Sequence, residues 1–436
     1  MGDGMDYTQA MEYLEQIGHV GSKLGLESIT ELLQRLDNPQ DKLKFIHIGG
    51  TNGKGSTSAF LTSILVEAGY KVGRYISPVV ISYEESIQVV CGMGEVTASF
   101  IQREQIAKHM RVIKQVCDEM VRDGFNQPTR FEVETTMAML EFVEQNADFV
   151  VLEVGLGGRL DATNVIQTVL CSVITSISMD HMQFLGDTLE AIATEKAGII
   201  KSGVPVVSYD QKDEVKKVLQ EVCKEKGSKL YLLHHDSLQI QKMDVNGSTF
   251  FYESEEPYYV SLLGRHQVYN AFVAMNVAYV LMEKGVPITD EHVRLGLANT
   301  KWFGRFSILE KNPYVIVDGA HNKDAALMLK EALKIYFKKK KGIFVMGVFA
   351  DKDYEEILKI TAPLAKKILT VTTPTDRALP SDQLKEAASK YCREVIDACD
   401  VEHALTIAKR LAKPEDYILC FGSLSFLGDV YRYSVE

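Results

Sequence analysis

Short apolar runs alternate with longer stretches of helical periodicity along most of the 436-residue chain. From Tyr7 to Leu36 the apolar residues recur at helical spacing, and the alternation begins after that segment. Each apolar run is followed by Gly, Asp or Ser and then by a helix-like stretch. Continuous apolar runs are typical of parallel strands that helices cover on both faces. The pattern therefore predicts an α/β protein.

The predicted strands fall into two groups. The first group reads KFIHIGG, KVGRYIS, DFVVLEVG, CSVITSIS and PVVSY, and the second reads YVIVDGAHN, KGIFVMGVFADKD, KKILTVTTP and DYILCFGSLSFLG. Between them, the helical pattern stops at NTKWFGRF, near residues 300–307. We therefore expect an N-terminal domain with a mainly parallel sheet at residues 1–303. A smaller, Rossmann-like α/β domain is expected at residues 304–436.

Composition and charge exclude several classes of protein. Hydrophobic residues make up 46% of the chain and charged residues 25%, as in a globular enzyme. The net charge of -11 argues against a basic surface for nucleic acid or for anionic membranes. The seven Cys residues show no CxxC spacing, which indicates neither a disulfide framework nor a zinc site. No signal pattern or membrane-spanning apolar run is present, so we expect a cytoplasmic protein.

The stretch FIHIGGTNGKGSTSAFLTSIL reads as a variant phosphate loop. The pattern GxxxxGK[ST] would place Gly at position 48 and Ser or Thr at position 55, where the chain has Ile48 and Gly55. A strand that enters a glycine-rich turn and then a helix directs backbone N–H groups at one point, where an anion binds. Lys54 can reach the β and γ phosphates, and a hydroxyl of Ser56 or Thr57 can face magnesium. The candidate nucleotide-binding residues of this loop are Gly50, Thr51, Asn52, Gly53, Lys54, Gly55, Ser56 and Thr57.

An ordinary glycine-rich turn would have the same glycines, but the lysine and the two hydroxyls at the helix start favour nucleotide binding. We expect the helix that follows, GSTSAFLTSIL, to be amphipathic.

Ionisable side chains end two of the predicted strands. Glu153 ends the strand DFVVLE, at the edge where open α/β sheets bind ligands, and Asp161 and Asn164 lie in the loop beyond it. Asp180 and His181 follow the next strand. An acid at a strand end is often a loop cap, and a lone histidine is more often structural than a ligand. The pairing of Glu153 with His181 at one edge favours a metal site.

A series of sequence blocks lies in order over nearly the whole chain, from about Tyr7 to Leu427. They are GTNGKGS, SP, FEVETTMAML, EVGLGGRLDATN, DHM, EKAGIIKSG, GRHQVYNAFVA, FGRF, DGAHN and FADKDY. Together they resemble the folylpolyglutamate synthase and dihydrofolate synthase family, which belongs to the Mur ligase superfamily. The resemblance accounts for the variant loop, because amide ligases of this group have Gly after the Lys and Ser one place later.

The resemblance implies an ATP-dependent amide ligase. In this family, ATP and magnesium activate the terminal carboxylate of a folate as an acyl phosphate. The amine of L-glutamate then displaces the phosphate, and ADP leaves. Two magnesium ions are implied, with ligands that match Ser77, Glu153 and His181 and a hydroxyl at Ser56. The family also implies carbamylation of Lys196, which makes this residue a carboxylate near the second ion. From the residues alone, Lys196 would be a solvated charge on a helix.

The remaining blocks supply residues that match further positions of the family site. Asn270 and Arg305 match nucleotide-binding positions, and Asp318 and His321 follow the first strand of the C-terminal domain. Without the resemblance, DGAHN would be a turn with a capping residue. A site closed by the second domain would keep water from an acyl phosphate. The catalytic candidates are therefore Lys54, Lys196, His181, Asp318 and His321. The nucleotide-binding candidates are the loop residues together with Asn270, Arg305 and Asp318. The metal candidates are Ser56, Ser77, Glu153, His181 and Lys196.

The chain departs from the family pattern after Ser77. The family reads SPH and then Asn-Glu-Arg-Ile, whereas this chain has Val79 in the His position and Ser86 in the Arg position, while Glu85 keeps the acid. Ser307 also stands where an acid is common. The loop after Ser77 is expected to border the pterin or the metal, so these departures concern pterin recognition and substrate choice. The ATP and magnesium positions themselves are intact.

We therefore expect a monomeric folylpolyglutamate synthase that uses ATP, L-glutamate and a folate, with dihydrofolate synthase activity on dihydropteroate as a further option. A Mur-type ligase for another carboxylate is the first alternative, but it would normally carry a further N-terminal domain. Only 44 residues precede the first strand of the phosphate loop. An ATPase-type binding module, which would release phosphate without regard to glutamate or folate, is the second alternative.

Overall fold

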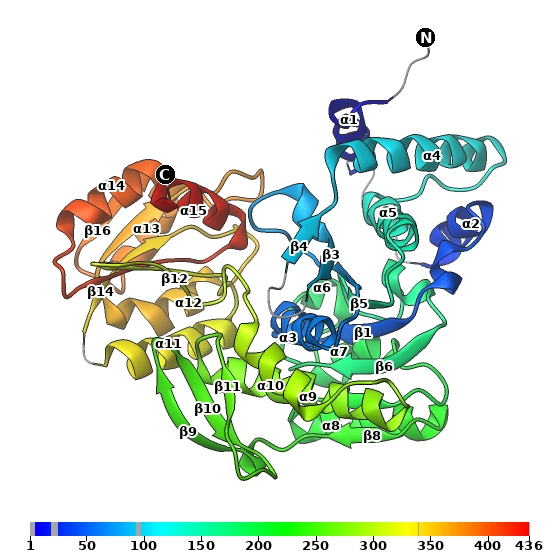
Figure 1. Ribbon diagram of the computed structural model, residues 1–436. Helices are drawn as coiled ribbons and strands as arrows, with labels where there is room; N and C mark the ends of the chain where they lie inside the picture. The colour runs from blue at the N-terminus through cyan, green and yellow to red at the C-terminus, as the bar shows by residue number, and fades with distance from the viewer. Residues whose placement is uncertain (1–4, 19–24, 93–96, 339, 436) are drawn as a thin grey trace. The chain divides into compact units, whose positions relative to one another are not determined.

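The computed structural model describes residues 5–18, 25–92, 97–338 and 340–435, which form two compact units (Figure 1). The first unit comprises Met1–Ser77, Glu84–Ser237 and Asn270–Asn299, and the second comprises Pro78–Tyr83, Leu238–Tyr269 and Thr300–Glu436. Two segments that precede residue 303 thus cluster with the second unit. The division at residues 303 and 304 stays a prediction, and each unit is described by itself.

The first unit contains an eight-stranded sheet with the order β4-β3-β2-β5-β1-β6-β7-β8. Neighbours from β2 to β8 pair in parallel, whereas β3 pairs antiparallel with both β2 and β4. The strands are β1 (Phe45–Gly49), β2 (Val72–Tyr75), β3 (Ile87–Cys91), β4 (Thr97–Phe100), β5 (Phe149–Glu153), β6 (Val169–Ile174), β7 (Val206–Ser208) and β8 (Leu230–Leu232). The five strands predicted for this region are all present, and the prediction of a mainly parallel sheet is confirmed.

Helices cover both faces of this sheet, as parallel strands with continuous apolar runs require. The helices that lie wholly or mostly in this unit are α1 (Tyr7–Gly18), α2 (Glu27–Arg35), α3 (Lys54–Glu67), α4 (Arg103–Arg122), α5 (Arg130–Glu144), α6 (Met182–Leu185), α7 (Leu189–Ala197), α8 (Asp213–Lys226), α9 (Arg265–Glu283) and α10 (Asp290–Asn299). The helical spacing from Tyr7 to Leu36 corresponds to α1 and α2, and residues 19–24 lie outside the described part. Helix α5 begins with a capping box, in which Thr129 and Glu132 exchange hydrogen bonds.

The helix after the phosphate loop, α3, differs from the expectation of an amphipathic helix. Every residue from Gly55 to Glu67 is buried. The reason is that α3 packs on β1, β2 and β5 and also against α10. A helix that is apolar or small all round is typical of such a fully buried position.

The second unit contains a six-stranded sheet with the order β12-β13-β17-β14-β15-β16 and a three-stranded antiparallel sheet with the order β11-β10-β9. In the larger sheet only the β12–β13 pair is antiparallel. The strands are β9 (Gln239–Asp244), β10 (Gly247–Phe251), β11 (Tyr258–Val260), β12 (Ser307–Lys311), β13 (Tyr314–Asp318), β14 (Gly342–Met346), β15 (Ala365–Val371), β16 (Val395–Cys399) and β17 (Tyr417–Phe421).

The core of the second unit lies on both faces of its larger sheet. Along β13, Ile316 belongs to one apolar cluster and Val315 and Val317 belong to the other, as the alternation of side chains along a strand requires. The helices that cover the two faces are α11 (Lys323–Phe337), α12 (Tyr354–Thr361), α13 (Ser381–Ser389), α14 (Val401–Leu411) and α15 (Leu427–Val435). The predicted α/β character of this region is confirmed.

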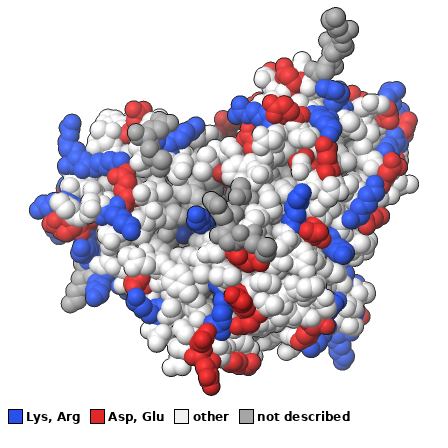
Figure 2. Space-filling model, viewed as in Figure 1, with Lys and Arg blue, Asp and Glu red and all other residues white. Residues whose placement is uncertain are grey.

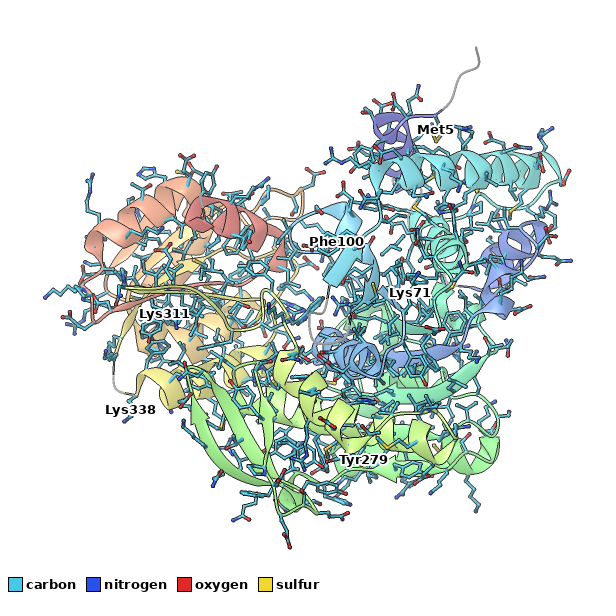
Figure 3. The ribbon with its side chains drawn as sticks, in the orientation of Figure 1. Met5, Lys71, Phe100, Tyr279, Lys311 and Lys338 are labelled. Carbon is cyan, nitrogen blue, oxygen red and sulfur yellow. The ribbon has the colours of Figure 1, made fainter. Side chains whose placement is uncertain are left out.

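The surface carries both signs of charge. On the face shown in Figure 2, acidic and basic side chains are interspersed. Figure 3 draws the side chains, among them Lys71 directly before β2, whose backbone N–H donates to Asp148 Oδ2 at 2.8 Å and ties the start of β2 to that of β5. Among the described helices, none combines the length and the apolar character needed to cross a membrane.

The packing of α10 on α3 requires a glycine, so Gly296→Ala should destabilise the protein. A Cβ atom at position 296 would lie 2.5 Å from Ile64 Cα and 2.6 Å from Ile64 N, and a backbone cannot yield as a flexible side chain does. Overpacking of this kind costs about 1–3 kcal/mol, which denaturant unfolding would measure. Leu295→Ala is the matched control, because Leu295 is exposed on the same helix and its loss should change stability by less than about 0.5 kcal/mol. Equal stability of Gly296→Ala and the wild type would contradict the close approach of the two helices.

Candidate active site

The phosphate loop connects β1 to α3 in a conformation that leaves no room for extra side-chain atoms. Gly50 and Gly53 have φ angles of 143° and 92°, which L residues with side chains rarely adopt. A Cβ atom at Gly50 would lie 1.9 Å from Thr175 Oγ1, and one at Gly53 would lie 2.5 Å from Asn270 Oδ1. The structure therefore brings Asn270, a predicted nucleotide-binding residue, against the loop.

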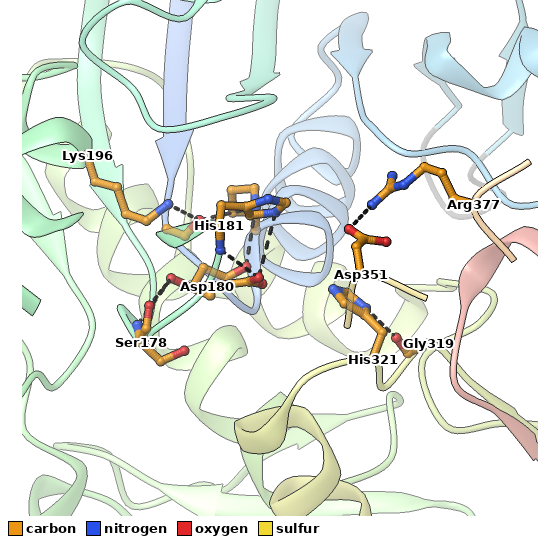
Figure 4. Close-up of polar contacts among 11 residues, drawn as sticks. Ser178, Asp180, His181, Lys196, Gly319, His321, Asp351 and Arg377 are labelled. Carbon is orange, nitrogen blue, oxygen red and sulfur yellow. Dashed lines mark hydrogen bonds and ion pairs between the residues drawn. The ribbon is translucent and has the colours of Figure 1, made fainter. Parts of the chain in front are cut away.

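Hydrogen bonds hold the loop to the segment that follows β6. The backbone N–H of Thr51 donates to Ser176 O at 2.8 Å. The Thr51 hydroxyl donates to Ser178 O at 3.2 Å and accepts from Ser178 N at 3.1 Å (Figure 4). These bonds join the loop after β1 to the segment after β6.

Two lysine side chains converge on one carbonyl oxygen of the loop. Lys54 Nζ donates to Gly50 O at 3.2 Å and to Thr51 O at 3.4 Å. Lys196 Nζ, at the end of α7, donates to the same Gly50 O at 2.9 Å (Figure 4). Burial, together with the charge of Lys54, lowers the pKa of Lys196 to about 7. Two ammonium groups this close make the region attractive to an anion.

Glu153 lies beside these lysines. It ends β5, is 5% exposed, and places its Oε1 3.9 Å from Lys54 Nζ. On the neighbouring strand β2, the buried Arg74 also faces acids: burial lowers its pKa to about 10, opposed by the charges of Glu153 and Glu85. Arg74 was not among the residues predicted for the site. The available signal was a single charged residue in the middle of the apolar run KVGRYIS.

Polar side chains join the loop after β5 to the end of α7. Asp161 Oδ2 accepts from Leu156 N at 2.8 Å and its Oδ1 from Thr163 N at 3.0 Å. Asn164 Nδ2 donates to Arg159 O at 3.0 Å and to Gly198 O at 3.1 Å. These bonds join the loop to the end of α7, which carries Lys196. Asp161 and Asn164 therefore act as caps and ties of this loop.

The other predicted metal ligands are His181, Ser77 and Ser56. His181 directly precedes α6 with a φ of 52° and an exposed side chain, and its backbone N–H donates to Asp180 Oδ1 at 2.9 Å (Figure 4). Ser77 is half-buried and Ser56 is buried. Within the described part of the chain, no three His, Cys, Asp or Glu side chains are grouped so that they could hold a metal ion.

These residues nevertheless fit magnesium that arrives with a nucleotide. Magnesium is usually held by one or two carboxylates together with phosphates and waters, and does not need a cage of protein ligands. Glu153 supplies such a carboxylate. In the first turn of α3, Thr57 Oγ1 is buried without a hydrogen-bond partner among the described residues, so a hydroxyl is also available next to Ser56.

In the second unit, the structure brings Asp318, Arg305 and His321 together. Asp318 ends β13 and accepts hydrogen bonds from Phe306 N at 2.8 Å and from Ala320 N at 2.9 Å. Burial raises the pKa of Asp318 to about 6, and Arg305 opposes this shift. Arg305 is so close that a Cβ atom at Gly319 would lie 2.2 Å from its Nη1. His321 Nδ1 donates to Gly319 O at 2.8 Å (Figure 4).

The loop geometry predicts that Gly53→Ala weakens nucleotide binding. The substitution places a side chain at a φ of 92° and against Asn270, so the turn must change shape and its N–H groups lose their common direction. We expect ADP affinity, measured by titration calorimetry, to fall by about tenfold or more, since strain of 1–2 kcal/mol corresponds to such a change. Gly124→Ala is the matched control, because Gly124 has a φ of 90° and a Cβ atom there meets nothing within 4 Å. Unchanged ADP affinity in Gly53→Ala would refute the loop as the phosphate site.

Comparisons with known proteins agree with this geometry. Residues 48–278 match the Mur ligase middle domain, and residues 304–424 match the Mur ligase glutamate ligase domain. The chain is 33% identical over 433 residues to the dihydrofolate synthase/folylpolyglutamate synthase of Bacillus subtilis (strain 168), covering 98% of both chains.

Solved structures give the same result. The folylpolyglutamate synthase of Thermotoga maritima is 35% identical with a TM-score of 0.84, and 98% of this chain and 96% of that chain are covered. Escherichia coli FolC, solved in complex with DHPP and ADP, is 29% identical with a TM-score of 0.81 and 97% coverage of each chain. The chain therefore belongs to the folylpolyglutamate synthase and dihydrofolate synthase family of Mur-type glutamate ligases.

Proposed function

We propose that this chain uses ATP to join L-glutamate to the carboxylate of a folate, and that it also accepts dihydropteroate. The observation that carries this function is the convergence of Lys54, Lys196 and Glu153 at the phosphate loop of a chain that matches both Mur ligase domains. Support for the second substrate comes from the Bacillus subtilis relative, whose name carries both activities, and from the Escherichia coli structure with DHPP and ADP.

The chain's own residues suit a reaction between two anions. The loop N–H groups and Lys54 bind the phosphates of ATP and offset their charge, so that a carboxylate can approach. Asn270 lies against the loop, where it can orient the nucleotide. We assign Arg305, Asp318 and His321 of the second unit to nucleotide binding and to the transfer step, as the resemblance implies.

Magnesium, when bound, neutralises charge on the phosphoryl group during transfer. We assign its ligands to Ser56, Ser77, Glu153 and His181, with Lys196 as a carbamate near a second ion. The environment of Lys196 supports carbamylation, because only a neutral amine reacts with CO₂ and a pKa of about 7 leaves this amine largely neutral at pH 8. A monomeric state and a cytoplasmic location complete the prediction.

Turnover should require a folate-type acceptor. With ATP, magnesium and glutamate present, ADP release should rise on addition of dihydropteroate or tetrahydrofolate and should not respond to a UDP-muramyl acceptor. A response to the UDP-muramyl acceptor alone would favour a Mur-type ligase, and ADP release that ignores both glutamate and acceptor would favour an ATPase-type module.

Two variants separate the assigned roles in the same assay. Lys54→Ala and Glu153→Ala should lower turnover by at least about a hundredfold while both variants still fold, because each removes charge stabilisation of the transferring phosphate. Retained turnover in either variant would remove that residue from the mechanism.

Val79 and Ser86 lie where the family pattern has other residues. The ratio of turnover with dihydropteroate to turnover with tetrahydrofolate therefore reports whether these departures alter substrate choice.

Carbamylation of Lys196 predicts a dependence on dissolved CO₂. Turnover should fall after incubation in CO₂-depleted buffer and return on addition of bicarbonate. With ¹³C-bicarbonate, a carbamate NMR signal should be present in the wild type and absent in Lys196→Met. Lys201 is the matched control, because burial lowers its pKa to about 8 as well, and Lys201→Met should keep the signal. A carbamate signal that survives in Lys196→Met would refute the assignment.

A further inference from the structure

Arg74 is a buried cation in the middle of the sheet of the first unit. It is 7% exposed and lies on β2, one residue after Gly73. A Cβ atom at Gly73 would lie 2.6 Å from Phe142 Cδ1 of α5, so Gly73 faces α5. Successive side chains of a strand point to opposite faces, and Arg74 therefore faces the side of the sheet that α3 covers. Burying a guanidinium is costly unless acids and hydrogen-bond acceptors surround it.

The partners of Arg74 come from both neighbouring strands. Across the antiparallel pair it stands opposite Gln88, and its Nη2 donates to Gln88 Oε1. Gln88 Nε2 in turn donates to Glu85 O at 2.7 Å. Across the parallel pair Arg74 stands opposite Val151, two residues before Glu153. Residues two apart in a strand share a face, so Arg74 and Glu153 face the same side.

The fields of two carboxylates act on this guanidinium. Glu153 contributes most to raising the pKa of Arg74, and Glu85 contributes next. Both glutamates are buried, at 5% and 8% exposure. Arg74 therefore lies in reach of the charge of both acids, and Glu153 is the proposed magnesium ligand.

The position of Arg74 explains a departure noted in the sequence. Ser86 stands where the family pattern has Arg, next to the retained acid Glu85. The β2–β3 pairing continues to a hydrogen bond from Ile76 N to Ser86 O at 3.0 Å, so Ser86 lies two residues from Gln88 along the same ladder. Diagonal neighbours in an antiparallel pair lie within reach of a long side chain. A guanidinium that starts at position 74 can thus occupy the region that one starting at position 86 would reach.

We propose that Arg74 is a positioning residue: it holds the Glu153 carboxylate ready for magnesium nucleotide and supplies, from β2, the positive charge that the family pattern places at position 86. This inference rests on the proposed function of the site. Lys54, at 3.9 Å, also balances Glu153, but Lys54 must turn to the phosphates when nucleotide binds. Arg74 is bonded to Gln88 on the adjacent strand, so its charge remains available to Glu153 when Lys54 turns.

A titration of ADP with and without magnesium tests this role through binding alone. In the wild type, magnesium should tighten ADP binding relative to ADP in EDTA. In Arg74→Met, binding in EDTA should stay within about threefold of the wild type, because the phosphate loop is untouched. The tightening by magnesium should fall by about tenfold to a hundredfold, the loss usual when a group that orients a metal ligand is removed.

The double variant Arg74→Met/Ser86→Arg makes the test specific to the charge. It returns an arginine from the neighbouring strand and should restore most of the tightening by magnesium. Arg35→Met is the control, because Arg35 pairs with Glu31 of its own helix and with Asp123 at the end of α4, and its loss should leave both affinities unchanged. If Arg74→Met does not fold, as judged by its melting curve, the double variant and Arg74→Lys decide the outcome, and both should keep the tightening.

The outcomes separate this inference from the proposed function. Absence of tightening by magnesium in the wild type would overturn the proposed metal site itself. Full tightening in Arg74→Met, an equal loss of affinity with and without magnesium, or a double variant no better than the single one would overturn the role of Arg74 and leave the proposed function standing.

Discussion

The site depends on the approach of two ammonium groups to one backbone oxygen. Lys54, which is half-buried, and Lys196, which is buried, both donate to Gly50 O, at 3.2 and 2.9 Å. Like charges at such a separation repel, and the lowered pKa of Lys196 records that cost together with its burial. A bound polyphosphate would relieve this repulsion at Lys54, and the proposed carbamylation would remove it at Lys196, because it turns the amine into an anion. The same arrangement that is unfavourable for the protein alone thus favours its anionic ligand.

This arrangement is possible only because the backbone around it cannot move. Gly50 and Gly53 hold conformations and contacts that a Cβ atom would prevent, and Thr51 ties the loop to the strand beside it. Helix α3, which carries Lys54, is buried between the sheet and α10. The loop after β5, through Asn164, fixes the end of the helix that carries Lys196. The packing of these two helices therefore places Lys54 and Lys196 close to each other.

Much of the fold follows from the sequence because buried parallel strands are long apolar runs that glycines and acids end. The nine strands predicted on this basis all form. The three-stranded sheet of β9, β10 and β11 gave no such signal, because β9 reads QIQKMD and has no buried residue, and β10 and β11 alternate buried with more exposed residues over short lengths. The strands β3 and β4 were not predicted either. They form the antiparallel end of the sheet, with β4 at its edge, where a strand does not need the continuous apolar run of a buried parallel strand.

Some residues of the site could likewise be predicted from sequence patterns, and others could not. The proximity of Lys54 to Glu153 was predictable, since a helix that follows one strand and the tip of the next strand share one edge of the sheet. The position of Lys196 came from the resemblance alone, because a lysine near the end of a helix has no local mark of burial. Arg74 was missed for a related reason. A charged residue within an apolar run shows that something must balance it, but only the register of β2 against β3 and β5 shows that the balancing groups are Gln88, Glu85 and Glu153.

The net charge of -11 does not mean that the site repels anionic substrates. Charges on the surface act on a ligand over a short distance only, whereas charges within the site act on it directly. Exposed charges are screened over about 8 Å at physiological ionic strength, and the acidic and basic side chains on the face in Figure 2 are interspersed. Inside the site the cations are buried, where screening by salt is weak and each charge acts more strongly than at the surface. Because Arg74 is buried and Lys54 is half-buried beside Glu153, these two cations act more strongly on a polyphosphate than the surplus of acids on the surface does.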